Sequence, residues 1–175
     1  MEPVIHFAIP FAIATLLGLR LKYAFLVGLI SLLPDFDVLF FIHRSVSHSL
    51  LIPLALLFIS LLWKKSRLQL PLQLSSFGLS SHVILDFING YTPILWPVSQ
   101  NSFKLVFELR LLIESFPMLY FNLNILERPY EYGTFITFDA PLFTAEGLAI
   151  ASLLIALSIV ISSKGLGIFL KRDEV

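Results

Sequence analysis

The chain has 175 residues, the length of one domain, and its composition is that of a membrane protein. Hydrophobic residues make up 57% of it and charged residues 14%, and the mean hydropathy is +0.88. The formal net charge is zero and cysteine is absent. These values exclude disulfides, thiolate catalysis and cysteine zinc sites, and no basic block suggests a nucleic-acid partner. We therefore expect a single integral membrane domain over residues 1–175, with His, Asp and Glu as its strong metal ligands.

Two apolar runs begin the chain. Residues 4–19 have no basic region before them and no small-residue cleavage site, so we interpret them as a retained membrane segment rather than a signal peptide. Residues 23–42 are long enough to cross a bilayer, but Pro34 lies inside this run and lacks a backbone donor. The sequence therefore predicts a second span that is broken where Asp35 and Asp37 appear.

Two further apolar runs follow, at residues 49–63 and 68–89. In the later one, polar residues recur at steps of three or four, which predicts a helix with one polar stripe. His82 and Asp86 belong to that stripe and lie one turn apart. We expect this face to point into a helix bundle.

The last part of the chain divides into two regions. Residues 101–141 mix charged and aromatic side chains, which we interpret as amphipathic segments lying in the membrane interface. Residues 142–163 form the clearest spanning helix. The predicted fold is all-α and polytopic, with about five transmembrane helices, a broken second helix and an interfacial region, and with the motifs for a metal site confined to residues 1–100.

The distribution of lysine and arginine predicts the orientation of these spans. With five alternating spans, eight of the twelve basic residues fall on one side, which the positive-inside rule makes cytoplasmic. The C-terminus is then cytoplasmic, and the polar ends of the spans face the extracytoplasmic side. The eight residues are Arg20, Lys22, Lys64, Lys65, Arg67, Lys164, Lys171 and Arg172.

Imidazoles and carboxylates gather near the extracytoplasmic ends of the predicted spans. Such groups cost several kcal/mol each at membrane depth unless they are paired or coordinated, so their clustering indicates a functional site. Neutral imidazole and carboxylate together suit a divalent metal, zinc in the first place, with manganese or iron as alternatives. The candidate ligands are His6, Asp35, Asp37, His43, His48, His82 and Asp86.

Seven candidates are more than one tetrahedral zinc needs, which suggests two metals or one metal with surrounding carboxylates. Two-metal sites are typical of phosphoester chemistry. Asp37 and Arg44 are the candidate catalytic residues, and the guanidinium of Arg44 has the geometry to bind a phosphate on the substrate. Ser47 and Ser49 are more simply explained as helix-capping residues than as nucleophiles.

Four sequence motifs also resemble a known family. Together with His6, which matches an early histidine of the pattern, these motifs resemble the YdjM-type family of membrane-bound, metal-dependent hydrolases. The His82-x-x-x-Asp86 element is also loosely similar to zinc phospholipase C and to P1-type nucleases. The resemblance implies a prokaryotic inner-membrane protein that uses the matching His and Asp residues as metal ligands. The motifs are Leu33-Pro34-Asp35-Phe36-Asp37, His43-Arg44-Ser45-Val46-Ser47-His48-Ser49-Leu50, Leu79-Ser80-Ser81-His82-Val83-Ile84-Leu85-Asp86 and Leu95-Trp96-Pro97.

Each candidate also has a purely structural interpretation. His6 fits a polar contact inside a helix bundle, and Asp35 fits a helix cap after Pro34. Arg44 and Asp37 fit a buried ion pair. The His82 and Asp86 side chains fit a hydrogen bond within one helix.

The sequence thus favours a membrane-bound, metal-dependent hydrolase that acts on a phosphoester of a lipid or membrane-associated substrate at the extracytoplasmic face. The alternative is a non-enzymatic helical membrane protein. It would use the same cluster to bind a lipid head group, to handle protons or ions, or to dock a partner.

Overall fold

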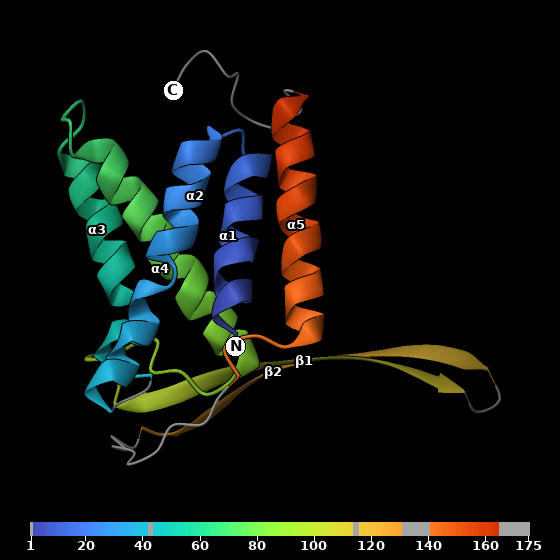
Figure 1. The fold of residues 1–175 in the computed structure, drawn as a ribbon. Helices are drawn as coiled ribbons and strands as arrows, with labels where there is room; N and C mark the ends of the chain where they lie inside the picture. The colour runs from blue at the N-terminus through green and yellow to red at the C-terminus, as the bar shows by residue number, and fades with distance from the viewer. Residues whose placement is uncertain (1, 42–43, 114–115, 131–140, 165–175) are drawn as a thin grey trace.

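The computed structural model describes residues 2–41, 44–113, 116–130 and 141–164. This part of the chain contains five α-helices, two 3-10 helices and one antiparallel pair of strands (Figure 1). The elements in chain order are α1 (Pro3–Leu16), α2 (Leu21–Ile30), η1 (Leu33–Phe40), η2 (Val46–His48), α3 (Leu51–Leu62), α4 (Gln69–Asn89), β1 (Asn101–Ile113), β2 (Pro117–Pro129) and α5 (Ala145–Ser163).

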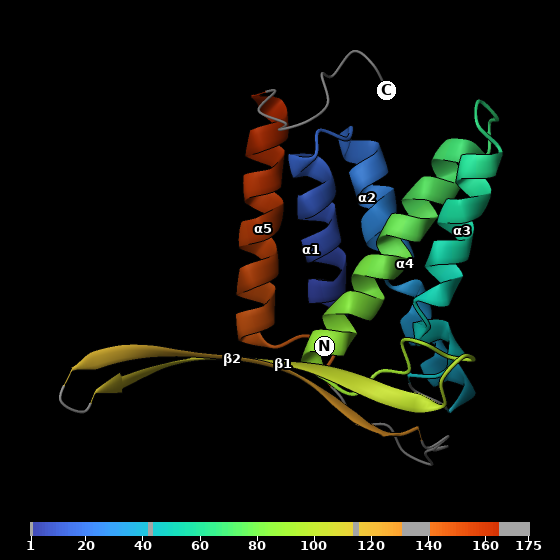
Figure 2. The ribbon, with the colours of Figure 1, turned by 180° about the vertical axis from the view of Figure 1, so that it is seen from behind.

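The helices form a bundle in which each α-helix runs opposite to the one before it in the chain, so that the packed pairs α1 with α5 and α2 with α4 are parallel. α1 packs between α2 and α5, and α4 packs on α3 and on α2 (Figures 1 and 2). Gly78 lets α4 approach α2 closely, because a Cβ there would lie 2.8 Å from the backbone oxygen of Val27. Close backbone approach at small residues is typical of helix packing in membranes.

The number of membrane-spanning helices predicted from the sequence is wrong. In the described residues, two helical stretches are long and apolar enough to cross a bilayer: Leu21–Phe40, which joins α2 to η1, and Ala145–Ser163. α1 and α3 are apolar but have only 14 and 12 residues, which is about 21 and 18 Å of helix against a hydrocarbon core of about 30 Å. α4 has 21 residues, but its polar stripe lowers its hydropathy.

The second predicted span changes helix type near Pro34. The α-helix α2 ends at Ile30, and the 3-10 helix η1 begins at Leu33. Phe41, directly after η1, has a left-handed φ of 58°. Asp35 and Asp37 thus lie in the 3-10 segment between the end of α2 and this left-handed turn.

The prediction of an all-α fold is also wrong, because most of residues 101–129 form strands. β1 and β2 pair in antiparallel register from Asn101 opposite Pro129 to Ile113 opposite Pro117. The physical reason is the period of the pattern: apolar residues alternate with polar ones along β1, which suits a strand and gives a helix no apolar face. We call this two-stranded element the β-ribbon.

The β-ribbon lies across one end of the helix bundle. Both views show it passing below the ends of α4, α1 and α5 and extending outward beyond α5 (Figures 1 and 2). The N-terminus, η1 and the C-terminal end of α4 lie at this same end. The turns between α1 and α2 and between α3 and α4 lie at the opposite end, as does the C-terminal end of α5.

Candidate metal centre

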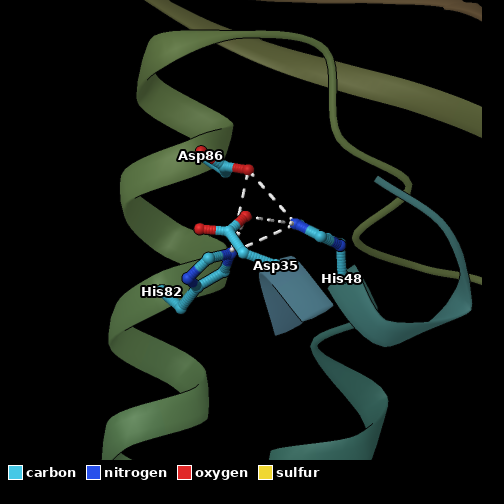
Figure 3. A group of neighbouring side chains, drawn as sticks. All are labelled: Asp35, His48, His82 and Asp86. Carbon is cyan, nitrogen blue, oxygen red and sulfur yellow. Dashed lines mark hydrogen bonds and ion pairs between the residues drawn. The ribbon is translucent and has the colours of Figure 1, made fainter. Parts of the chain in front are cut away.

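Four side chains from three elements converge at the end of the bundle next to the β-ribbon (Figure 3). η1 supplies Asp35, η2 supplies His48, and α4 supplies His82 and Asp86 one turn apart. One ligand atom from each residue lies within 4.8 Å of all the others. His48, His82 and Asp86 are fully buried, and the side chain of Asp35 is 21% exposed. We call these four residues the metal cluster.

The distances inside the metal cluster fit a tetrahedral ion. Nε2 of His48 lies 3.1 Å from Nε2 of His82 and 3.3 Å from Oδ2 of Asp86. Oδ1 of Asp35 lies 3.7 Å from His48 Nε2 and 3.5 Å from His82 Nε2, and His82 Nε2 lies 3.9 Å from Asp86 Oδ2. A tetrahedral zinc with bonds of about 2.0–2.1 Å holds its ligand atoms about 3.3–3.4 Å apart. Small side-chain movements would therefore bring all four atoms into coordination.

The charges around the metal cluster also fit a divalent cation. Among the described residues, the carboxylates of Asp35, Asp37 and Asp86 surround His48, and the guanidinium of Arg44 pairs with Asp86 alone, so negative charge exceeds the fixed positive charge at this point. Burial favours the neutral imidazole of His48, but hydrogen bonds to the three carboxylates outweigh burial and raise its pKa to about 10. The surroundings therefore favour positive charge at this point.

Asp37 lies beside the metal cluster and holds His48 by its other ring nitrogen. Oδ2 of Asp37 lies 3.3 Å from His48 Nδ1 and accepts hydrogen bonds from the hydroxyls of Ser45 and Ser47. The backbone N–H of Ser45 donates to the same oxygen. A carboxylate behind a histidine fixes its ring orientation and tautomer, which is the usual arrangement behind a metal-binding histidine.

Arg44 binds Asp86 and not Asp37. Its Nε donates to Asp86 Oδ2 at 3.1 Å, its Nη2 to Oδ1 at 3.4 Å, and its Nη1 to the carbonyl oxygen of Tyr91. The backbone of Arg44 has a left-handed φ of 56°, which is uncommon outside glycine and turns the side chain back onto α4. Gly90 makes room for it, since a Cβ there would collide with the guanidinium.

His6 lies next to the four and contacts the outer oxygen of Asp86. Its ring stacks on His82 with centroids 4.0 Å apart, and its Nε2 lies 3.3 Å from Asp86 Oδ1. The hydroxyl of Ser31 donates to the carbonyl oxygen of His6 and fixes α1 against α2 at this level. His6 is thus buried against the metal cluster without belonging to it.

The structure brings together most of the site residues that the sequence predicts. Asp35, His48, His82 and Asp86 share one centre, and His6, Asp37 and Arg44 surround it. His43, the seventh candidate ligand, lies outside the described residues. The sequence reasoning missed Gly90 and the Tyr91 carbonyl, which position Arg44 after the end of α4. It also missed Ser45, although the Ser-x-Ser-His spacing is a signal for hydroxyls beside an imidazole.

The fold and the site define a class: a helical membrane protein with a buried His/Asp cluster that is able to hold a metal ion. The particular family follows from comparison with known proteins. The profile of the YdjM inner membrane protein family matches residues 1–165, so the chain belongs to that family, which confirms the resemblance seen in the motifs. Comparison with curated proteins and with solved structures found no match.

Proposed function

We propose that this inner-membrane protein is a metal-dependent hydrolase that acts on a phosphoester of a lipid or membrane-associated substrate. The observation that carries the proposal is the convergence of two imidazoles and two carboxylates, from three separate elements, within 4.8 Å. Zinc is the favoured metal because the donor set mixes nitrogen and oxygen at tetrahedral spacing. When bound, such a metal lowers the pKa of a water molecule and provides hydroxide near neutral pH.

The chain's own residues have distinct roles in this proposal. Asp37 keeps His48 oriented through Nδ1, and Arg44 keeps Asp86 oriented through both carboxylate oxygens. Arginine has five N–H donors, and the contacts with Asp86 and Tyr91 use three of them among the described residues. The side chain of Arg44 is 20% exposed, so its remaining donors are available to a phosphate oxygen.

The proposal includes an extracytoplasmic site. The end of the bundle opposite the metal cluster carries the two helix-connecting turns and the last residue of α5 (Figure 1). Basic residues gather at this opposite end, and the positive-inside rule assigns such an end to the cytoplasm. They are Arg20, Lys22, Lys64, Lys65, Arg67 and Lys164.

Metal analysis of the purified full-length protein tests the first part of the proposal. We expect bound zinc, manganese or iron in the wild type, and its loss in the double variant His82→Ala/Asp86→Ala. Ser81→Ala is the matched control, because Ser81 neighbours His82 on α4 but its hydroxyl only donates to the carbonyl oxygen of Phe77. Metal content that is unchanged in the double variant would refute the metal site.

Turnover is tested separately with chromogenic phosphodiesters and with phospholipids in mixed micelles. We expect hydrolysis that a chelator abolishes and that added zinc or manganese restores. A protein that binds metal stoichiometrically but cleaves none of these compounds would contradict phosphoester hydrolysis and favour a binding or ion-handling role for the same cluster.

A further inference from the structure

The two faces of the β-ribbon differ sharply in chemistry. In an antiparallel pair, residues opposite each other share a face, and successive residues alternate between faces. One face, from Leu105 to the tip, carries only apolar side chains and proline, and we call it the apolar face. Its pairs are Leu105 with Ile125, Phe107 with Leu123, Leu109 with Phe121, Leu111 with Leu119, and Ile113 with Pro117.

The other face of the β-ribbon carries its charged and amide side chains along the same length. Glu108 lies opposite Asn122, Arg110 lies opposite Tyr120, and an ion pair of 2.8 Å joins Arg110 to Glu108. Over this length its aliphatic side chains are Val106, which lies opposite Asn124, and the pair of Leu112 with Met118 at the tip. We call it the polar face.

At its inner end the apolar face points toward the helix bundle, and farther out none of the residues that the structure describes covers it. Leu105 lines an apolar pocket together with Val83, Ile84 and Phe87 of α4. Beyond this contact the same face continues outward, and Phe107 and Leu109 are each 59% exposed. Such a run of exposed aromatic and branched side chains is larger than soluble proteins normally leave uncovered.

The position of the β-ribbon relative to α5 bears on what covers the apolar face. α5 begins at the level of the β-ribbon and leads away from it on the side where the helices lie (Figures 1 and 2). α5 is long and apolar enough to cross a bilayer, and its exposed side chains include Leu148, Leu153 and Leu157. The exposed apolar surface of α5 therefore begins at the level at which the β-ribbon extends outward from the bundle.

We propose that the β-ribbon binds the lipid surface at the end of the bundle that carries the metal cluster. Its apolar face inserts among the lipids of that leaflet, and its polar face lies in the water and headgroup layer. Charge distribution agrees with this placement, because the charged residues of this outer stretch, Glu108 and Arg110, are on the polar face. The lipid-binding surface is continuous with the lipid-facing surface of the helices, and it does not depend on the metal cluster being occupied or catalytic.

A cysteine scan of β1 in reconstituted vesicles tests the proposal. The chain contains no cysteine, so each introduced thiol gives one labelling site. The full-length variants carry an environment-sensitive fluorophore, and they are exposed to brominated phospholipid or to iodide on both sides of the membrane. The five positions alternate between faces: Phe107→Cys, Glu108→Cys, Leu109→Cys, Arg110→Cys and Leu111→Cys.

We expect quenching with a period of two residues. Brominated lipid should quench the probes at 107, 109 and 111 at least about twofold more than those at 108 and 110, and iodide should show the reverse order. Ile159→Cys on the exposed surface of α5 is the control for lipid contact, and Lys64→Cys is the control for water contact. Equal access of iodide to all five positions would overturn the proposal.

A second copy of the chain is the competing occupant of the apolar face, and the same scan distinguishes it. If another copy covered this face, the probes at 107, 109 and 111 would be shielded from both quenchers, and a thiol crosslinker would join two chains at these positions. That result would overturn lipid binding. Because the readout is independent of metal and of turnover, its failure would leave the proposed hydrolase function untouched.

Discussion

His48 is the most highly constrained side chain of the candidate metal centre. Its Nε2 faces the other three ligand atoms, while its Nδ1 lies 3.3 Å from Asp37 and 3.0 Å from the Ser47 hydroxyl. Orientation of a metal-binding imidazole from behind commonly changes metal affinity by about 10–100-fold. The serines and Asp37 therefore belong to the site functionally, although none of them belongs to the metal cluster.

Removal of the Asp37 carboxylate should weaken metal binding without removing a ligand. We expect Asp37→Ala to lower the affinity for zinc by about 10–100-fold, and Asp37→Asn to lower it less, because its amide oxygen still accepts a hydrogen bond from Nδ1. Competition with a chromogenic chelator measures the affinity. A wild-type affinity in both variants would show that Asp37 does not orient His48.

Gly90 and Arg44 should behave as one unit. Gly90→Ala places a Cβ against the guanidinium, whereas the backbone, with φ of −165°, tolerates alanine. We expect the displaced Arg44 to leave Asp86 without its charged partner, which destabilises the fold by about 2–4 kcal/mol.

A double-mutant cycle measures this coupling by thermal unfolding in detergent. Arg44→Ala alone should have a similar effect to Gly90→Ala, and the double variant should be little worse than either single variant. Additive losses would show that the two residues act independently.

The local parts of the site could be predicted from the sequence, and its long-range pairs could not. The four-residue spacing of His82 and Asp86 brings their side chains together in any helix, so this pair could be predicted. The partner of Asp86 depends on the left-handed turn at Arg44, and no short-range pattern predicts such a turn. Asp37 is closer to Arg44 in the sequence and was therefore considered as its ion-pair partner. The left-handed turn at Arg44 instead directs the guanidinium to Asp86 on α4.

At the scale of elements, the contact between α2 and α4 positions the metal cluster. Gly78 of α4 lies against the Val27 carbonyl of α2, one turn before His82, and α2 leads through η1 to Asp35. The separation of the two helices therefore determines the distance between the ligands that each of them carries or leads into.

Gly78→Ala should push these two helices apart and lower the metal content. The new Cβ would meet backbone at 2.8 Å, which no side-chain rotation relieves. Gly28→Ala is the matched comparison, because its closest contacts are with the ring of Phe7, which can turn away. We expect metal analysis and melting temperature to show the larger loss for Gly78→Ala, and equal losses would contradict a role for this contact in positioning the site.

A second contact holds α5 to the beginning of α1. The carboxylate of Glu2 accepts hydrogen bonds from the backbone N–H and the hydroxyl of Thr144, which in turn caps α5 through the N–H of Gly147. The hydroxyl bond and the backbone bond to Thr144 lower the pKa of Glu2 below its ordinary value of 4.5. Deprotonated Glu2 is therefore favoured in the folded protein.

Glu2→Gln should lower the melting temperature at pH 7 and abolish part of its dependence on pH. Because the folded-state pKa is lowered, the contribution of Glu2 is present above pH 4.5 and is lost as the pH falls through the folded-state value. We expect the wild type and the variant to converge on acidification. A constant difference in melting temperature down to pH 3 would contradict the assignment.

The β-ribbon shows why an element can be missed when composition is considered before period. Residues 101–141 were interpreted as amphipathic segments lying in the membrane interface, because charged and aromatic residues are mixed there. The apolar residues Phe103, Leu105, Phe107, Leu109 and Leu111 occur at every second position, which is the pattern of a strand. The long apolar runs of the helices have no such ambiguity, and helices were predicted correctly there, although the number that can span a membrane was not.

At the scale of the whole molecule, the site residues and the basic residues lie at opposite ends of the helix bundle. The metal cluster and the β-ribbon share one end, and the basic turns occupy the other (Figure 1). This separation makes the orientation in the membrane a testable property of the complete chain.

Reporter fusions measure the orientation directly. We expect reporters placed after Trp63 and after Lys164 to report the cytoplasm, because both positions lie at the end rich in lysine and arginine. A fusion after Gln100, just before β1, should report the opposite side. A periplasmic signal from either of the first two fusions would contradict the proposed orientation.

The two-stranded nature of the β-ribbon limits how deeply it can sink. Both strands are edges, so beyond the bridge between Phe103 and Thr92 the outward N–H and C=O groups of β1 and β2 have no further strand to pair with among the described residues. Each such group costs several kcal/mol in hydrocarbon, and the backbone must stay where water or lipid oxygens reach it. If the β-ribbon binds lipid as proposed, its side chains enter the leaflet while its backbone stays at the membrane surface, which limits its depth. In this proposed placement the metal cluster, which α4 joins to the inner end of the β-ribbon, would lie near the phosphate and ester groups of the lipids.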